Sequence, residues 1–178
     1  MSKDWKILSK KGIFSDDWKS VEEWQVQTHN GDSLSFSMVI EKDVVIVFGI
    51  TPDDKILLLR QHYISAQKKV PTLVAGIVMN NDHKLVAGNE LHEEAGCRAK
   101  EMVHLGSSFR GKYVTGSVHY YLAKDIESCL SQELEPAEDI EIEFISLEKF
   151  KGLLRNCEIE DQAQLACSYL ALDYLGKL

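Results

Sequence analysis

The stretch Ala75–Cys97, AGIVMNNDHKLVAGNELHEEAGC, decides how the rest of the chain is interpreted. It begins with apolar residues, turns at a glycine, crosses a polar loop and ends in a run typical of a helix. That run carries Glu90, Glu93 and Glu94. In a helix these positions are i, i+3 and i+4, so the spacing predicts three carboxylates on one face. Gly96 is well placed to end the helix.

The acidic face has two interpretations. Clustered carboxylates repel one another, and their oxygens suit Mg²⁺, which keeps several waters and bridges to substrate phosphates. The cluster therefore predicts a metal site, whereas the alternative is a solvated acidic helix face, which is common in soluble proteins. Leu85, Leu91 and Ala95 fall on the opposite side of the helix, and we expect them to pack on a core.

The residues Glu90–Cys97, ELHEEAGC, resemble the second half of the Nudix box, G-x5-E-x7-R-E-U-x-E-E-x-G-U, in which U is a bulky apolar residue. Gly76 matches the opening glycine, and Asp82 stands where the first acid belongs. The sequence departs from the box in three ways. Asp82 replaces glutamate, the next spacer is one residue short, and Asn89 holds the position of an arginine that helps to orient a metal-binding glutamate in the family.

The resemblance extends over most of residues 44–175. VVIVFGITPDDKILLLRQ, residues 44–61, is similar to the paired strands that precede the box in ADP-ribose and nucleotide-sugar pyrophosphatases of the superfamily. The resemblance implies an α+β fold, namely the Nudix-type α/β/α sandwich with a mixed sheet. It also implies one Nudix domain over residues 1–178, in which residues 1–41 form N-terminal strands and residues 42–178 form the core.

Local patterns predict the individual elements. Asn30-Gly31 between alternating segments predicts a β-hairpin over Val21–Ile40, and the apolar run Val44–Ile50 predicts a strand buried on both faces. Further strands are expected at residues 56–61, 70–78, 102–109, 118–123 and 140–146, and helices at 84–95, 147–156 and 161–175. The last helix would bury Leu165, Ala166, Tyr169, Leu170 and Leu172, and residues 110–117 and 126–138 are expected to be loops.

Composition narrows the class of protein. A chain of 178 residues with 44% hydrophobic and 27% charged residues is typical of one globular domain. The net charge of −8 argues against a nucleic-acid or anionic-membrane partner. No apolar run approaches the roughly 20 residues of a membrane span, and no signal-peptide core is present, so we expect a cytoplasmic protein. The four cysteines form no CxxC pair, and no Cys/His cluster predicts zinc.

The resemblance implies a metal-dependent hydrolase. Its substrate would be a nucleoside diphosphate linked to another moiety, such as a nucleotide sugar or an ADP-ribose-like compound, cleaved at the pyrophosphate bond. On the family pattern, Glu90, Glu93 and Glu94 bind Mg²⁺ (or Mn²⁺) together with the carbonyl of Ala75. Glu94 and a glutamate of a late loop would be catalytic, and the late glutamate at the matching position is Glu138.

Several site assignments stay open on the sequence alone. Glu135 and Glu133 are alternatives to Glu138 as the base, and most acids of this loop must be bystanders. Tyr63 stands where branch members often carry an arginine. Arg60, Arg110 and Gly116 are therefore the expected substrate-binding residues, with Lys112 as a further cation, although each cation is also readily explained as a surface residue.

The N-terminal strands and the altered box lead to two further expectations. The hairpin has apolar content and edges that a small domain does not cover alone, and branch members exchange such strands, so we expect a homodimer. Trp18 or Trp24 would stack a base across the dimer or else pack within the hairpin. Asn89 and the short spacer favour an alternative function, a Nudix-fold ligand-binding or regulatory protein without catalysis. A structural interaction module fits only if the glutamate face is occluded.

Overall fold

The computed structural model describes residues 4–16, 19–79, 82–128 and 131–178. The chain forms two compact units, Met1–Asp43 with Ser108–Ser117, and Val44–Ser107 with Val118–Leu178. Trp18 lies outside the described residues. Within the described ranges, no helix has both the length and the apolar character that a membrane crossing requires.

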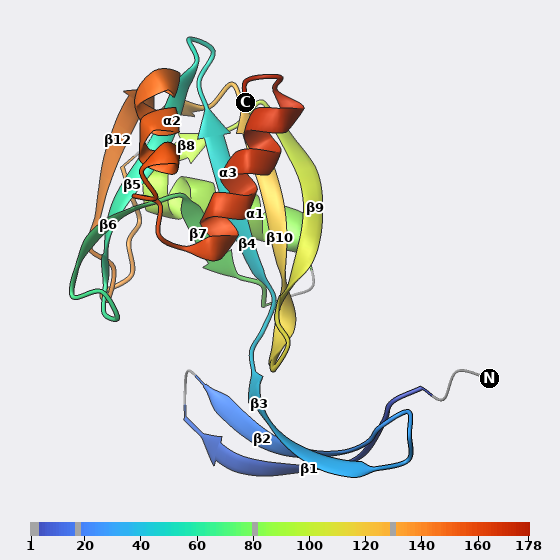
Figure 1. Cartoon of the computed structure of the whole chain (residues 1–178). Coiled ribbons are helices and arrows are strands. Elements are labelled where there is room, and N and C mark those ends of the chain that lie inside the picture. Colours follow the sequence, from blue (N-terminus) through green and yellow to red (C-terminus); the bar gives the residue numbers. More distant parts are fainter. Residues whose placement is uncertain (1–3, 17–18, 80–81, 129–130) are drawn as a thin grey trace. The chain divides into compact units, whose positions relative to one another are not determined.

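The first unit contains the expected hairpin. Strands β1 (Lys6–Ser15), β2 (Ser20–Gln27) and β3 (Ser33–Ile40) pair antiparallel in that order (Figure 1). The turn between β2 and β3 is closed by Thr28 N–H, which donates to Asp32 O at 2.8 Å, and Gly31 takes the positive φ of 95° that the turn needs. The hairpin predicted over residues 21–40 is confirmed.

Trp24 packs within this unit. The Lys10 ammonium lies 3.9 Å from the centre of its indole ring, and the indole Nε1–H donates to Glu22 Oε2 at 2.6 Å. Both contacts hold the ring against its own hairpin. Of the two roles expected for Trp24, they favour packing within the hairpin over stacking on a base.

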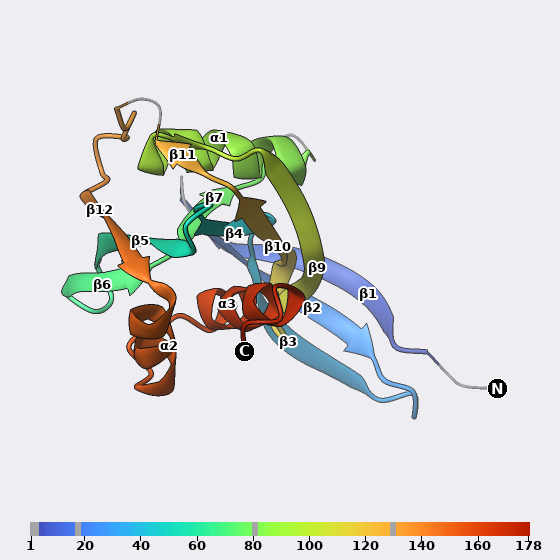
Figure 2. The ribbon, with the colours of Figure 1, turned by 90° about the horizontal axis from the view of Figure 1, so that it is seen from above.

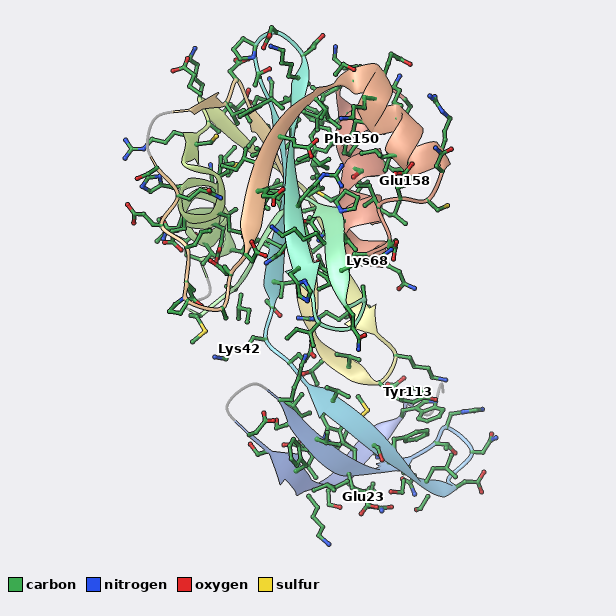
Figure 3. All side chains as sticks on the ribbon, turned by 90° about the vertical axis from the view of Figure 1, so that its left-hand side faces the viewer. Glu23, Lys42, Lys68, Tyr113, Phe150 and Glu158 are labelled. Carbon is green, nitrogen blue, oxygen red and sulfur yellow. The ribbon has the colours of Figure 1, made fainter. Side chains whose placement is uncertain are left out.

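The expected loop at residues 110–117 is instead mostly strand. Strand β9 (Glu101–Gly111) and strand β10 (Val114–Lys124) continue through it and leave only a short turn, which contains Tyr113, labelled in Figure 3. Val114 pairs in parallel with Val39, and Val39 N–H donates to Tyr113 O at 2.9 Å. Because β3 satisfies these backbone groups, glycines and cations here do not force a loop.

The second unit is built on a mixed sheet. Its strands β4 (Val44–Ile50), β5 (Lys55–Tyr63) and β12 (Ile140–Ser146) follow β10 in the order β10-β4-β5-β12. The β10/β4 pair is parallel, and the other two pairs are antiparallel. Figure 2 shows helix α1 (His83–Ala95) on one face of these strands, and helices α2 (Leu147–Arg155) and α3 (Gln162–Tyr174) on the other. The predicted α+β class with three layers is confirmed.

The strand predicted over residues 70–78 is wrong as one element. The chain forms β6 (Lys68–Thr72), which pairs with β5, and then β7 (Val74–Ile77), which pairs with β4. The switch occurs at Leu73, whose N–H donates to Gln164 Oε1 of α3 at 2.7 Å instead of to a strand. The expected loop at 126–138 also contains a short strand, β11 (Glu127–Ser128), paired with β8 (Cys97–Arg98).

Two apolar layers flank the sheet. Ile56 and Leu58 of β5 pack in the layer under α2 and α3, and Leu57 and Leu59 pack in the layer under α1. Phe150 of α2, labelled in Figure 3, meets Phe48 edge to face at 5.3 Å.

Helix α3 buries a different face from the one expected. Its buried residues are Gln164, Cys167, Ser168, Ala171 and Leu172. Tyr169 and Leu170 are exposed, contrary to the prediction. Small side chains let the helix approach the sheet closely, so the larger apolar residues turn outward.

Candidate functional site

Helix α1 is fixed at both ends by local chemistry. The Asp82 carboxylate accepts a hydrogen bond from Leu85 N–H at 3.0 Å, so the residue expected as the first acid of the box is the N-cap. Gly96 ends the helix in the left-handed conformation with φ 58°, as predicted.

The helix is turned so that its glutamates have different environments. Leu91 and Ala95 are buried as expected, but Leu85 is exposed because Val86 and Ala87 take the core positions. Glu93 is exposed and Glu90 is half-buried. Glu94 is only 3% exposed, so a fully solvated acidic face does not describe this helix.

Glu94 reaches inward to strand β7. Its Oε2 accepts a hydrogen bond from Ala75 N–H at 3.0 Å. The pKa of Glu94 is raised to about 8, mainly by burial, with the hydrogen bond from Ala75 opposing the rise and the negative charges of Glu90, Glu138 and Glu93 adding to it. The role of the Ala75 carbonyl as a ligand stays a prediction, since the contact seen here uses its N–H.

Glu90 occupies the space that Gly76 leaves open. A Cβ atom on Gly76 would lie 1.9 Å from Glu90 Oε1 and 2.0 Å from its Cδ, so any larger residue displaces the whole carboxylate. The pKa of Glu90 is raised to about 7, mainly by burial and also by the negative charges of Glu93, Glu138 and Glu135. The opening glycine of the box is thus explained by the close approach of a carboxylate.

The loop before β12 is anchored to the end of α1. Glu133 N–H donates to Glu93 O at 2.9 Å, and the Gln132 amide donates to Glu94 O at 2.7 Å. Glu138 closes a turn with Glu135, because its Oε2 accepts from Glu135 N–H at 2.8 Å and its own N–H donates to Glu135 O at 3.0 Å.

The structure therefore brings Glu138 and Glu135 close enough to influence the box glutamates. Glu133, the third candidate base, has its carboxylate 3.6 Å from His92 Nε2 instead. His92 of α1 thus contacts the loop before β12, and no sequence pattern predicted this contact.

The donor set suits a hard divalent cation. It consists of carboxylate oxygens, which Mg²⁺ and Mn²⁺ prefer. The pKa values of Glu90 and Glu94 are raised first by burial and then by the surrounding negative charges. Within the described residues, Glu90, Glu93 and Glu94 are not a group whose oxygens are already spaced to share one metal ion. Like charges spread apart, and a cation would draw them together.

Arg60 is not brought to the carboxylates. It follows Ile56 and Leu58 on the α2/α3 side of β5, where its Nε donates to Glu143. Lys149 of α2 also approaches Glu143, at 3.6 Å, and Arg60 is the main cause of the lowered pKa of Glu143. Arg60 is therefore a partner in an ion pair on the opposite face of the sheet from α1.

Arg110 and Gly116 belong to the first unit and are engaged there. Arg110 Nη2 lies 2.5 Å from Glu41 Oε2, and its Nη1 donates to Lys42 O at 3.2 Å. Gly116 has φ 81°, and a Cβ there would lie 2.5 Å from Lys42 O. These contacts hold β10 against residues 41–42, and they give the expected substrate-binding role no support.

Tyr63, at the position of the missing arginine, is held by α3. Its phenol oxygen accepts from Gln164 Nε2 at 3.0 Å, and burial raises its pKa to about 12, with contributions from Asp161 and Glu94. It borders a cavity of about 230 Å³ lined by Tyr63, Ser65, Ala66, Val70, Pro71, Thr72, Glu160 and Asp161. Lys68, labelled in Figure 3, pairs with Glu160 at 2.7 Å at this edge. None of the box glutamates lines this cavity.

A second group of possible ligands was missed by sequence reasoning. His83, His104 and His119 offer ring nitrogens that lie within 4.8 Å of one another. They are far apart in the sequence, so the expectation of no clustered histidines is corrected by the fold. Only the adjacency of β9 and β10 would have indicated the pair His104 and His119.

Two curated proteins and one solved structure are similar to this chain over nearly its whole length. No family model matches. The chain is 26% identical over 172 residues to an ADP-ribose pyrophosphatase of Bacillus subtilis (strain 168), covering 94% of this chain and 92% of that protein. It is 24% identical over 171 residues to a methanol dehydrogenase activator of Bacillus methanolicus, with the same two coverages.

A solved structure described as an ADP compounds hydrolase has the same fold. It superimposes with a TM-score of 0.82 over 98% of this chain and 97% of its own, at 18% sequence identity. The layered fold, the box helix and these relatives together confirm that the chain resembles the ADP-ribose pyrophosphatase branch of the Nudix superfamily, with an altered box.

Proposed function

We propose that this chain hydrolyses the pyrophosphate bond of a nucleoside diphosphate linked to another moiety, of the ADP-ribose or nucleotide-sugar class. The observation that carries the proposal is that the carboxylates of Glu90 and Glu94 meet the backbone of β7 at Gly76 and Ala75. The negative charge of Glu138 acts on Glu94 at the same place. Such crowding of acids is costly unless a cation binds among them, and clustered groups with shifted pKa values are typical of functional sites.

Each residue of the site has a separate role in the proposed reaction. Glu90, Glu93 and Glu94 would hold Mg²⁺ or Mn²⁺, which when bound neutralises phosphate oxygens and lowers the pKa of water. Ala75 N–H orients the Glu94 carboxylate by its hydrogen bond. Glu138 would accept the proton of the attacking water, with Glu135 as the alternative base, because both act electrostatically on Glu90.

The substrate class is supported by the relatives. One is named an ADP-ribose pyrophosphatase, and the solved structure of the same fold is named an ADP compounds hydrolase. The negative net charge of the chain is compatible with an anionic diphosphate if metal ions supply local positive charge.

A regulatory function is the second candidate. The relative named methanol dehydrogenase activator aligns over as much of the chain as the pyrophosphatase does. Asn89, which replaces the box arginine, is exposed and carries no charge. In this alternative the site binds a nucleotide and the chain acts on another protein.

We also propose that the protein is a homodimer formed through its first unit. β1 is exposed along its whole length, and Ile7, Leu8, Ile13 and Phe14 are each more than half exposed. An exposed apolar edge strand favours association. Light scattering should give twice the chain mass, and Ile13→Lys should reduce it, whereas Ile64→Lys, at an exposed residue of the second unit, should not. A monomeric wild-type protein would contradict this.

The test of the proposed function is turnover of a nucleotide-sugar panel that includes ADP-ribose. We expect cleavage with Mg²⁺ or Mn²⁺, none with a chelator, and loss of at least about 100-fold in Glu93→Gln/Glu94→Gln. Glu148→Gln, at an exposed acid of α2, is the matched control and should keep full activity. Nucleotide binding without cleavage by the wild-type protein would favour the regulatory function.

A further inference from the structure

Three histidines from three elements of the second unit meet in one place. His83 is the first residue of α1, His104 lies on β9 and His119 lies on β10. One ring nitrogen from each lies within 4.8 Å of the other two. In the part of the chain that the structure describes, this is the one group of three or more His, Cys, Asp or Glu residues that meets this spacing.

The rings are held in a defined arrangement. His83 and His119 stack with centroids 4.1 Å apart and an angle of 7° between their planes, and the His104 centroid lies 5.1 Å from that of His83. His83 Nδ1 is hydrogen-bonded to the hydroxyl of Tyr121, which is 1% exposed. Ser107 Oγ lies 2.8 Å from His119 Nδ1 and 3.2 Å from His104 Nε2.

We propose that His83, His104 and His119 form a binding site for a divalent transition metal of the Zn²⁺ class. Imidazole nitrogens suit Zn²⁺, Cu²⁺ and Ni²⁺, whereas Mg²⁺ prefers oxygen ligands. The hydrogen bond of Tyr121 to His83 resembles the outer contacts that orient imidazole ligands in metal sites. Three histidines leave the fourth tetrahedral position for a water molecule or another small ligand.

The spacing is compatible with this coordination. At Zn–N distances of about 2.1 Å, nitrogens in a tetrahedral site are about 3.4 Å apart. Coordination requires a contraction from the observed limit of 4.8 Å, and the stacked rings of His83 and His119 must also turn out of parallel, because a metal lies in the plane of each ring that binds it. His104 is exposed and can follow without disturbing the core.

The proposed site is separate from the glutamates. With a rise of about 1.5 Å per residue, Glu90 lies about 10 Å and Glu94 about 16 Å along α1 from His83. A bound metal would tie the first turn of α1 to β9 and β10. It would therefore stabilise the helix that carries the glutamates without taking part in their chemistry.

The test is a Zn²⁺ titration of the full chain by calorimetry, in Mg²⁺ at a concentration that saturates the glutamates. We expect one Zn²⁺ per chain, a higher melting temperature with Zn²⁺, and visible absorption bands when Co²⁺ replaces it. His104→Gln and His119→Gln should each weaken binding by about 10-fold or more. The matched control is His62→Gln, at an exposed histidine of β5 outside the cluster, which should bind as the wild type does.

Two results would overturn the proposal. Absence of Zn²⁺ binding to the folded wild-type protein at micromolar concentration would leave the rings as a stacked cluster that needs no metal. Binding that survives both His104→Gln and His119→Gln would place the ion elsewhere, for example at the exposed Cys157 thiol. His104 is exposed, so its substitution leaves the core intact, and the melting temperature without metal verifies folding.

Discussion

Raising the pH should destabilise the metal-free protein, and Glu94 should be the main cause. The pKa of Glu94 in the folded protein is about 8, well above its ordinary value of 4.5. Between these values the folded state keeps a proton that the unfolded state has lost. The contribution of Glu94 to the free energy of unfolding is therefore fully present below about pH 4.5 and is lost as the pH rises through about 8.

The size of this loss follows from the shift. Each pKa unit corresponds to about 1.36 kcal/mol, so a shift from 4.5 to about 8 gives a loss of about 5 kcal/mol if the carboxylate keeps its buried position. If the ionised Glu94 side chain turns toward solvent, the protein recovers part of this free energy. We therefore expect the free energy of unfolding to fall by about 2 to 5 kcal/mol. The raised pKa of Glu90 acts in the same direction. The free energy of unfolding of a typical domain is about 5–15 kcal/mol, so a change of this size is large.

Urea denaturation near pH 5 and near pH 8.5, with a chelator present, measures the loss. Glu94→Gln keeps an acceptor for Ala75 N–H but does not ionise, so its free energy of unfolding should change much less between the two pH values. Glu148→Gln should behave as the wild type. Mg²⁺ should restore stability near pH 8.5 more than near pH 5, because its ligands must be deprotonated. A wild-type stability that is constant or increases over this range would refute the reasoning.

Three further predictions concern catalysis. Gly76→Ala should lower turnover by about 100-fold, because its Cβ would displace Glu90, whereas Gly88→Ala, whose Cβ meets nothing within 4 Å, should retain activity and gain about 1 kcal/mol of stability. Glu138→Gln should slow hydrolysis by about 100-fold or more without changing the Mg²⁺-induced rise in melting temperature, and a normal rate would exclude it as the base. Asn89→Arg should raise turnover by fixing a neighbouring carboxylate, and a folded variant with no gain in steady-state rate would contradict this.

Much of the fold follows from local pattern. The continuous apolar run of β4, the alternation of β12 and the turn at Asn30-Gly31 predicted strands whose bounds agree closely with the structure. The end of helix α1 at Gly96 was also predicted, whereas the capping role of Asp82 was not. Where pairing depends on a distant partner, prediction was wrong. Residues 70–78 divide because a side chain of α3 takes the Leu73 N–H, and no local signal reports that contact.

Part of the candidate site could be predicted from residue spacing, and its role was implied by the family resemblance. Glu90, Glu93 and Glu94 were found from their positions in one helix, but the burial of Glu94 follows from how the helix is turned on the sheet. Arg60 shows the opposite case, because strand alternation decides which face a side chain takes and the sequence does not say which face carries α1. The histidine group needed the adjacency of α1, β9 and β10, which only the fold provides.

The central claim is that water attacks phosphorus at the site built on α1. Hydrolysis of ADP-ribose with Mg²⁺ in ¹⁸O-labelled water, followed by mass spectrometry of the two phosphate-containing products, tests it most directly. We predict AMP and ribose 5-phosphate in equal amounts, with one ¹⁸O atom in only one of them at each turnover, and almost no product from Glu94→Gln. Label in neither product, or equal product formation by Glu94→Gln, would contradict the account.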